Sequence, residues 1–150
     1  MQCSRLSLYV ATVHRYTTFT VKWPSAPPPT PSIDNSNLTA TASFTVQVTN
    51  TGPRDGDEVV QAYYVPGVSS DPLLRQIVAF QRVHVPAGRA EEVTLTVTPM
   101  DFIQVDTAGD SFSVPGTYQV LLTNGNDQTD AMVMATVKIT GTKRTVATFD

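Results

Sequence analysis

The sequence of 150 residues contains a single cysteine, Cys3, and only two histidines, His14 and His84. One cysteine cannot form an internal disulfide, and it excludes a zinc site built from several thiolates. Two histidines leave little material for Ser-His-Asp or Cys-His catalysis, which needs a base beside the nucleophile. His84 lies between Val83 and Val85, and this alternation predicts a solvent-facing strand residue instead of a catalytic base.

Charged residues are also scarce, at 15% of the chain, and the formal net charge is −3. A basic surface for nucleic acid or for an anionic membrane is therefore not expected. No apolar run approaches the roughly 20 residues that a membrane-spanning helix needs. The chain also has no glycine-rich loop of the kind that cradles phosphates. We predict no nucleic-acid partner, no membrane partner and no cofactor.

Threonine and valine are abundant instead, and both favour strands. The clearest strand pattern begins at Phe44, where Phe44, Val46 and Val48 alternate with polar residues. A turn-rich segment follows at 50–57, and 58–65 returns to an extended pattern. We expect these two strands to form a hairpin at the centre of a β-sandwich.

The rest of the chain repeats this alternation of strand and turn. The further predicted strands are Tyr16–Trp23, Leu73–Val85 (with a bulge), Glu92–Thr98, Thr117–Thr123 and Ala131–Thr140. Five prolines between Pro24 and Ser36 predict a loop or a polyproline segment there. The sequence thus predicts an all-β, immunoglobulin-like sandwich of about seven strands. Its expected bounds are 16–140, after a poorly defined lead-in at 1–15 and before a C-terminal tail at 141–150.

Two groups of acidic residues are candidates for chemistry. Asp55, Asp57 and Glu58 could bind calcium, but they lack the spacing of a known calcium loop, so we interpret them as a solvated turn. Asp101, Asp106 and Asp110 could supply a carboxylate pair for glycoside hydrolysis, but no sequence feature holds them in a cleft. We therefore predict no catalytic residue and no metal ligand.

Aromatic side chains on a surface are a common means of stacking on sugars. The candidates for a sugar or partner contact are Tyr63, Tyr64 and Trp23. One of the two adjacent tyrosines must face the core, and Tyr118 alternates with Val120, so core packing is the default interpretation of these rings.

Asn37-Leu38-Thr39 matches the acceptor pattern for N-linked glycosylation. The pattern has meaning only in a secreted protein, because the modification occurs in the secretory pathway. The sequence alone does not decide the compartment, and an extracellular or secreted location is the favoured expectation.

Several segments, in the same order, resemble the fibronectin type III-like domain at the C-terminus of family 3 glycoside hydrolases, the β-glucosidases and β-xylosidases. These segments are Tyr16–Phe19, Thr49–Gly52, Gly56–Val65, Arg75–Ile77 with Phe80, Arg82 and Val83, Pro86–Gly88, Val93–Pro99 with Asp101 and Asp106, and Pro115–Tyr118 with Val120. The similarity covers the chain from Tyr16 to about Thr123. Before Tyr16 the chain departs from the family, because Val13, His14 and Arg15 replace its usual glycine-rich lead.

The resemblance implies a fibronectin type III-like sandwich. It also implies a non-catalytic accessory module, because the family's catalytic barrel and its following α/β domain have no counterpart in these residues. The implied partners are the catalytic domains of a glycoside hydrolase, in cis or in trans, together with polysaccharide as an open alternative. A stand-alone carbohydrate-binding or adhesion domain is the competing hypothesis. An accessory module also predicts an exposed apolar patch where the partner domain lies.

Overall fold

The computed structural model describes residues 16–65, 76–125 and 129–148. The predictions for Cys3, His14, the lead-in, the turn at 66–72 and the first residues of the strand expected from Leu73 lie outside these ranges. The described residues contain β1 (Phe19–Lys22), β2 (Ser32–Asp34), β3 (Ala42–Asn50), β4 (Gly56–Val65), β5 (Gln76–Val85), β6 (Ala90–Val97), β7 (Gln104–Val105), β8 (Ser111–Ser113), β9 (Gly116–Thr123), β10 (Met132–Thr140) and β11 (Arg144–Ala147). Two short 3₁₀ helices, η1 (Pro99–Phe102) and η2 (Thr129–Ala131), complete the set.

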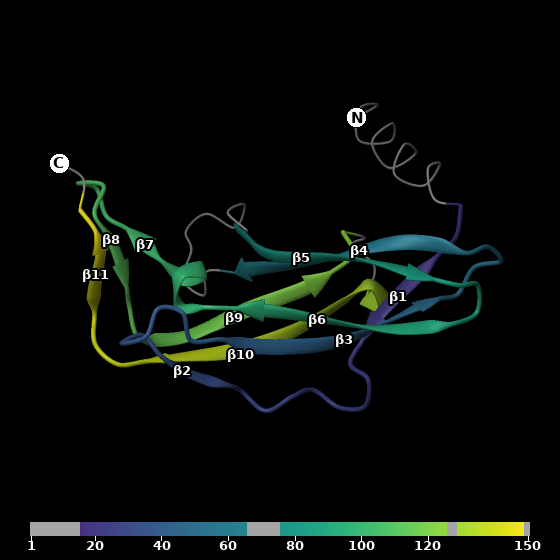
Figure 1. The fold of residues 1–150 in the computed structure, drawn as a ribbon, viewed down its shortest axis with the longest axis horizontal. Coiled ribbons are helices and arrows are strands. Elements are labelled where there is room, and N and C mark those ends of the chain that lie inside the picture. The colour runs from purple at the N-terminus through teal and green to yellow at the C-terminus, as the bar shows by residue number, and fades with distance from the viewer. Residues whose placement is uncertain (1–15, 66–75, 126–128, 149–150) are drawn as a thin grey trace.

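The strands form two main sheets and one small sheet (Figure 1). The first main sheet has the order β1-β3-β6, and the second has the order β2-β10-β9-β4-β5. All pairings are antiparallel except that of β2 with β10, which is parallel. The small sheet, β11-β8-β7, stands at one end of the sandwich. The predicted all-β sandwich is thus confirmed, with more strands than the seven expected.

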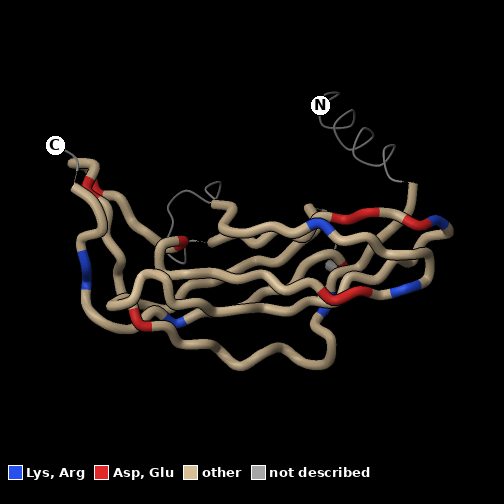
Figure 2. The backbone as a smooth tube through the Cα atoms, viewed as in Figure 1, with Lys and Arg blue, Asp and Glu red and all other residues tan. Residues whose placement is uncertain are grey.

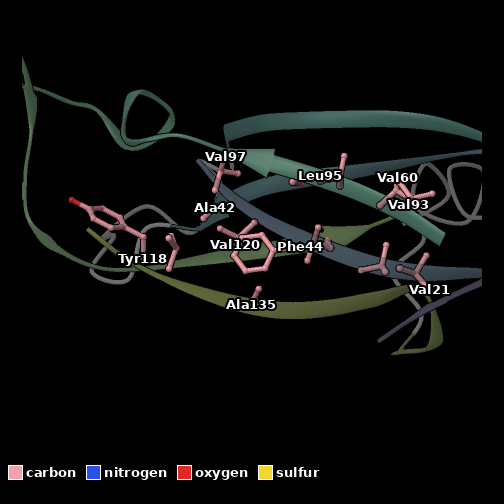
Figure 3. Close-up of a cluster of buried hydrophobic side chains, with 14 of the residues drawn as sticks. Val21, Ala42, Phe44, Val60, Val93, Leu95, Val97, Tyr118, Val120 and Ala135 are labelled. Carbon is pink, nitrogen blue, oxygen red and sulfur yellow. The ribbon is translucent and has the colours of Figure 1, made fainter. Parts of the chain in front are cut away.

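The core lies between the two main sheets and follows from the alternation in the sequence (Figure 3). In β3 every second residue is buried, and β6 shows the same alternation from Val93 to Val97. These side chains meet those of Val60 and Val120 from the second sheet. Each fully buried valine or phenylalanine contributes roughly 1.5–3 kcal/mol relative to the exposed side chain. The largest buried side chain from the first sheet is Phe44.

The expected hairpin between the strands at 44–49 and 58–65 is wrong. β3 pairs with β1 and β6, whereas β4 pairs with β5 and β9. The connection at 51–55 therefore crosses from one sheet to the other. Alternation shows which face of a strand is buried, but it does not identify the neighbouring strand, and two strands with one buried face each can also face one another across a core.

Four short strands, β2, β7, β8 and β11, lie where the sequence predicted no strand. β2 falls inside the proline-rich segment, at a tripeptide without proline, and pairs with Lys138–Thr140 of β10. β11 falls inside the expected tail and pairs with β8. The bulge expected in the strand before Val85 is present in β5, because Ala62 pairs with Ala79 and Tyr63 pairs with Ile77, which leaves Val78 without a partner.

A buried asparagine joins the segments at one end of the sandwich. Asn50 is fully buried, and its Oδ1 accepts hydrogen bonds from Thr17 Oγ1 at 2.6 Å and from the Gly52 amide at 3.0 Å. Its Nδ2 donates to the carbonyl oxygens of Arg54 at 2.7 Å and Val85 at 2.9 Å. All four hydrogen-bonding positions of the side-chain amide are satisfied, as burial requires.

Gly52 allows the close approach that this network needs. A Cβ at this position would lie 2.0 Å from Thr17 Oγ1 and 2.8 Å from the Thr18 backbone nitrogen. We predict that Gly52→Ala lowers the free energy of unfolding by roughly 1–3 kcal/mol, the usual cost of overpacking a tight site. Chemical denaturation followed by tryptophan fluorescence measures the change.

Gly116→Ala is the matched control. A Cβ at Gly116 would have Tyr118 Cε2 as its nearest neighbour, at an ordinary 3.8 Å. We expect a change within about 0.5 kcal/mol, as for an exposed position. Equal losses in the two variants would contradict a specific role for the contact between Gly52 and Thr17.

Candidate functional site

One long side of the sandwich is open between β5 and β6. Each of these strands is the last strand of its sheet, and the two lie next to one another. Between them runs a groove of about 510 Å³, lined by Ile77–Gln81 from β5 and Thr94–Thr96 from β6. We call this feature the β5–β6 groove.

The β5–β6 groove is largely apolar. Phe80 is 72% exposed and Ile77 is 48% exposed, which is unusual for side chains of this size. Val78 and Ala79 pack against the core, and Leu95, on the β6 side, is buried. An apolar groove with polar residues at its rim is typical of a surface that another protein segment covers.

The bulge at Val78 is what turns Ile77 outward. Without the extra residue, Ile77 would share the inward face with Ala79, because alternate residues of a strand share a face. With it, Ile77 lies opposite Tyr63 and Phe80 lies opposite Gln61, on the outer face of the second sheet. Tyr63 also donates a hydrogen bond to Gln61 Oε1. We call Tyr63, Ile77 and Phe80 the β5 patch.

The β5 patch and the β5–β6 groove lie in a stretch without charge. No Lys, Arg, Asp or Glu occurs in Gln76–Gln81 or in Val93–Val97. Most charged residues are near the two ends of the sandwich (Figure 2). Depletion of charge at the centre with aromatic enrichment is the composition found at the centre of protein–protein interfaces. The sequence predicted such a patch without giving its residues, because the bulge position and the edge strands depend on the pairing.

The three candidates for a sugar or partner contact do not form one surface. Tyr64 packs against the core, with its ring centroid 5.5 Å from those of Phe102 and Tyr118, and burial raises the pKa of both tyrosines. Trp23 also packs against the core, and among the described residues no ring contact joins it to either adjacent tyrosine. Tyr63 belongs to the β5 patch. Sugar or partner contact by these residues stays a prediction.

The first acidic group takes part in local contacts. Asp57 Oδ2 accepts from Arg82 Nε at 2.8 Å and forms a second bond to Arg82 Nη2, and Asp57 Oδ1 lies 2.6 Å from His84 Nδ1. Asp55 Oδ1 accepts from the Ala87 amide at 2.8 Å. The described residues contain no group of three or more His, Cys, Asp or Glu that could hold a metal ion. His84 is exposed, as predicted.

Two carboxylates of the second acidic group, Asp101 and Asp106, accept hydrogen bonds from nearby backbone amides. Asp101 Oδ2 accepts from the Thr98 amide at 2.7 Å and so caps η1. Asp106 Oδ1 accepts from the amides of Ala108 at 2.9 Å and Asp110 at 3.0 Å within a turn.

In the part of the chain that the structure describes, no helix is long and apolar enough to cross a membrane.

The contacts of Asp57 predict how it titrates. The hydrogen bond from His84 and then that from Arg82 hold the pKa of Asp57 below its usual value. A carboxylate with a lowered pKa stabilises the fold above its unfolded pKa, and this contribution is lost as the pH falls through the lower, folded value. We predict that His84→Ala raises the Asp57 pKa, measured by carboxyl ¹³C NMR, and that Arg82→Ala does so by less.

Asp34 is the internal control for this titration. Hydrogen bonds from Ser36 lower its pKa, and it lies on β2, at the opposite edge of the same sheet. Its pKa should not change in either variant. A parallel change at Asp34 and Asp57 would mean that the substitutions act through the whole fold.

The chain is similar to parts of known proteins. Residues 58–125 match the family model described as the fibronectin type III-like domain. A probable β-glucosidase M from Aspergillus flavus is 36% identical over 76 residues, which are 50% of this chain and 10% of that protein. A β-glucosidase of intestinal bacteria involved in saponin metabolism is 28% identical, with a TM-score of 0.66 over 83% of this chain and 16% of the other.

A GH3 exo-β-xylosidase shares the fold, with a TM-score of 0.65 and 22% identity over 87% of this chain and 18% of the other. The chain thus spans about a tenth of the curated relative and less than a fifth of each of these two solved structures. The remainder of each relative has no counterpart in these 150 residues.

Proposed function

We propose that this chain is a non-catalytic accessory module of a family 3 glycoside hydrolase, because it is similar to the fibronectin type III-like domain and to parts of β-glucosidases and a β-xylosidase. Its partner is the catalytic portion of such an enzyme, and the module stabilises that portion in carbohydrate breakdown. The observation that carries the proposal is the β5–β6 groove, an apolar and uncharged surface on a domain that corresponds to a small part of its relatives.

The partner is expected in cis, on the same polypeptide, or in trans, on a companion chain that supplies the same domains. In the relatives, more than four fifths of the chain lies outside the similar region. A domain that packs against such a neighbour needs a surface of low desolvation cost, and burial of Phe80 and Ile77 gives roughly 25 cal/mol per Å² of apolar area. The charged ends of the sandwich would be costly to bury unless each charge found a partner.

The non-catalytic role is supported by the contacts of the candidate carboxylates. Asp101 caps a 3₁₀ helix and Asp106 closes a turn. We predict that the purified chain does not hydrolyse aryl β-glucosides or β-xylosides above the uncatalysed rate, even at high protein concentration. Turnover that is lost in Asp106→Asn or Asp101→Asn would instead identify a residual hydrolase.

A carbohydrate-binding role remains the alternative, and Tyr63 is the residue that favours it. Its side chain is half-buried and shares the outer face of the second sheet with Phe80. Retention of the chain on cellulose, xylan or β-glucan, lost in Tyr63→Ala, would support this role over docking to a protein domain.

The docking hypothesis is tested by placing the chain in its proposed context. We predict that Phe80→Asp reduces the thermal half-life of a chimera in which this chain replaces the matching segment of the Aspergillus flavus relative. The reason is that a carboxylate would be buried against the catalytic portion without a partner. The same substitution should leave the melting temperature of the isolated chain unchanged within error, because Phe80 is already exposed.

Val105→Asp is the matched control. Val105 is 65% exposed, comparable to Phe80, but it lies on β7 in the small end sheet. Val105→Asp should change neither the thermal half-life of the chimera nor the melting temperature of the isolated chain. If Phe80→Asp and Val105→Asp behave alike in a chimera that folds and is active, docking through the β5–β6 groove is wrong.

A further inference from the structure

The only N-glycosylation pattern in the sequence lies at Asn37-Leu38-Thr39, in the connection between β2 and β3. We propose that Asn37 is an N-glycosylation site and that its glycan projects from the side of the sandwich opposite the β5–β6 groove. The glycan donor is a lipid-linked oligosaccharide of the secretory pathway. The proposal rests on passage of the chain through the secretory pathway and does not depend on the docking role proposed above.

The geometry of the turn suits the acceptor. Asn37 Oδ1 accepts two hydrogen bonds from Thr39, one from the backbone amide at 3.1 Å and one from Oγ1 at 2.7 Å. These bonds form an Asx turn and hold the amide oxygen and the threonine hydroxyl together. In the part of the chain that the structure describes, no hydrogen bond engages Asn37 Nδ2. That nitrogen is the atom to which the sugar is attached.

The neighbouring asparagine shows the contrast. Asn35 is buried, and its Nδ2 donates to the carbonyl oxygen of Thr142 at 2.7 Å and to Ser113 Oγ at 3.2 Å. A sugar on that nitrogen would break both contacts, and Asn35 is not part of an acceptor pattern. The exposed asparagine of the pair, Asn37, is the one that carries the pattern.

The strand order sets the direction of the glycan. β2 and β5 are the two edge strands of the five-stranded sheet, so they lie at opposite sides of the sandwich (Figure 1). The turn at 35–40 directly follows β2. A glycan on Asn37 therefore leaves the β5–β6 groove open and shields the β2 side.

The chemical step is a glycosyl transfer without oxidation or reduction. Asn37 Nδ2 attacks the anomeric carbon of the oligosaccharide, and a bond from nitrogen to that carbon forms. The bond from the anomeric carbon to the pyrophosphate oxygen breaks, the lipid pyrophosphate leaves, and one amide proton passes to a base. The product amide keeps one N–H and stays uncharged.

The test is expression of the whole chain behind a secretory leader in a eukaryotic host, followed by intact mass before and after peptide:N-glycosidase in ¹⁸O water. We expect a glycan mass on the wild type, with ¹⁸O-labelled deamidation at Asn37 after release. The glycan should be lost in Asn37→Gln, in Thr39→Ala and in Leu38→Pro, and it should be retained in Thr39→Ser.

Thermal unfolding of each secreted variant shows whether it is folded. Because both Asn37 and Thr39 are exposed, Asn37→Gln and Thr39→Ala should have the melting temperature of the wild type. A folded, secreted wild type without glycan would overturn the proposal, and so would a glycan that persists in Asn37→Gln.

Discussion

The hydrogen-bond network of Asn50 is the constraint on which the rest of the sandwich depends. Its side chain contacts the segment before β1, the connection from β3 to β4 and the last residue of β5. Its backbone donates to Arg89 O at 2.9 Å and accepts from the Gly88 amide at 3.0 Å. Two of the connections that cross between the sheets, from β3 to β4 and from β5 to β6, are thus joined at one residue. Because Asn50, Thr17 and Val85 are buried, a polar group left without its partner in these contacts would cost roughly 1–3 kcal/mol.

The connections at this end of the sandwich place β5 beside β6. The chain crosses to the second sheet after β3 and returns after β5, and β5 and β6 lie at the same side, each as the last strand of its sheet. The β5–β6 groove is a direct result of that topology. The ion pair of Asp57 with Arg82 and the turn contact of Asp55 with Ala87 lie at this end as well. Charged side chains therefore lie at the end where they bind the connecting segments, and they are absent from the strand segments that line the groove.

The sequence predicts the strands well and their partners poorly. Alternation identified β3, β4, β6, β9 and β10, because a half-buried strand must alternate. The same pattern led to the wrong prediction of a hairpin between β3 and β4, because two strands of a hairpin and two strands in facing sheets show the same alternation. β2, β7, β8 and β11 were missed because two to four residues carry too little periodicity. The bulge in β5 was expected, but its effect on Ile77 follows only from the register at Ala79, which no local pattern contains.

The two open edges of the five-stranded sheet differ in a way that separates their roles. An exposed strand edge invites pairing with other chains, and proteins protect such edges with proline, charge or a cover. On the β2 side, Pro31 directly precedes a strand of three residues, which leaves little edge to pair with. On the β5 side, Gln76–Gln81 has neither proline nor charge, and Phe80 is exposed. A bare edge next to an apolar groove is expected to be covered by a partner, whereas a proline-guarded edge can face solvent. The two edges of the sheet are therefore protected differently, and among the described residues only the β5–β6 side leaves an apolar surface uncovered.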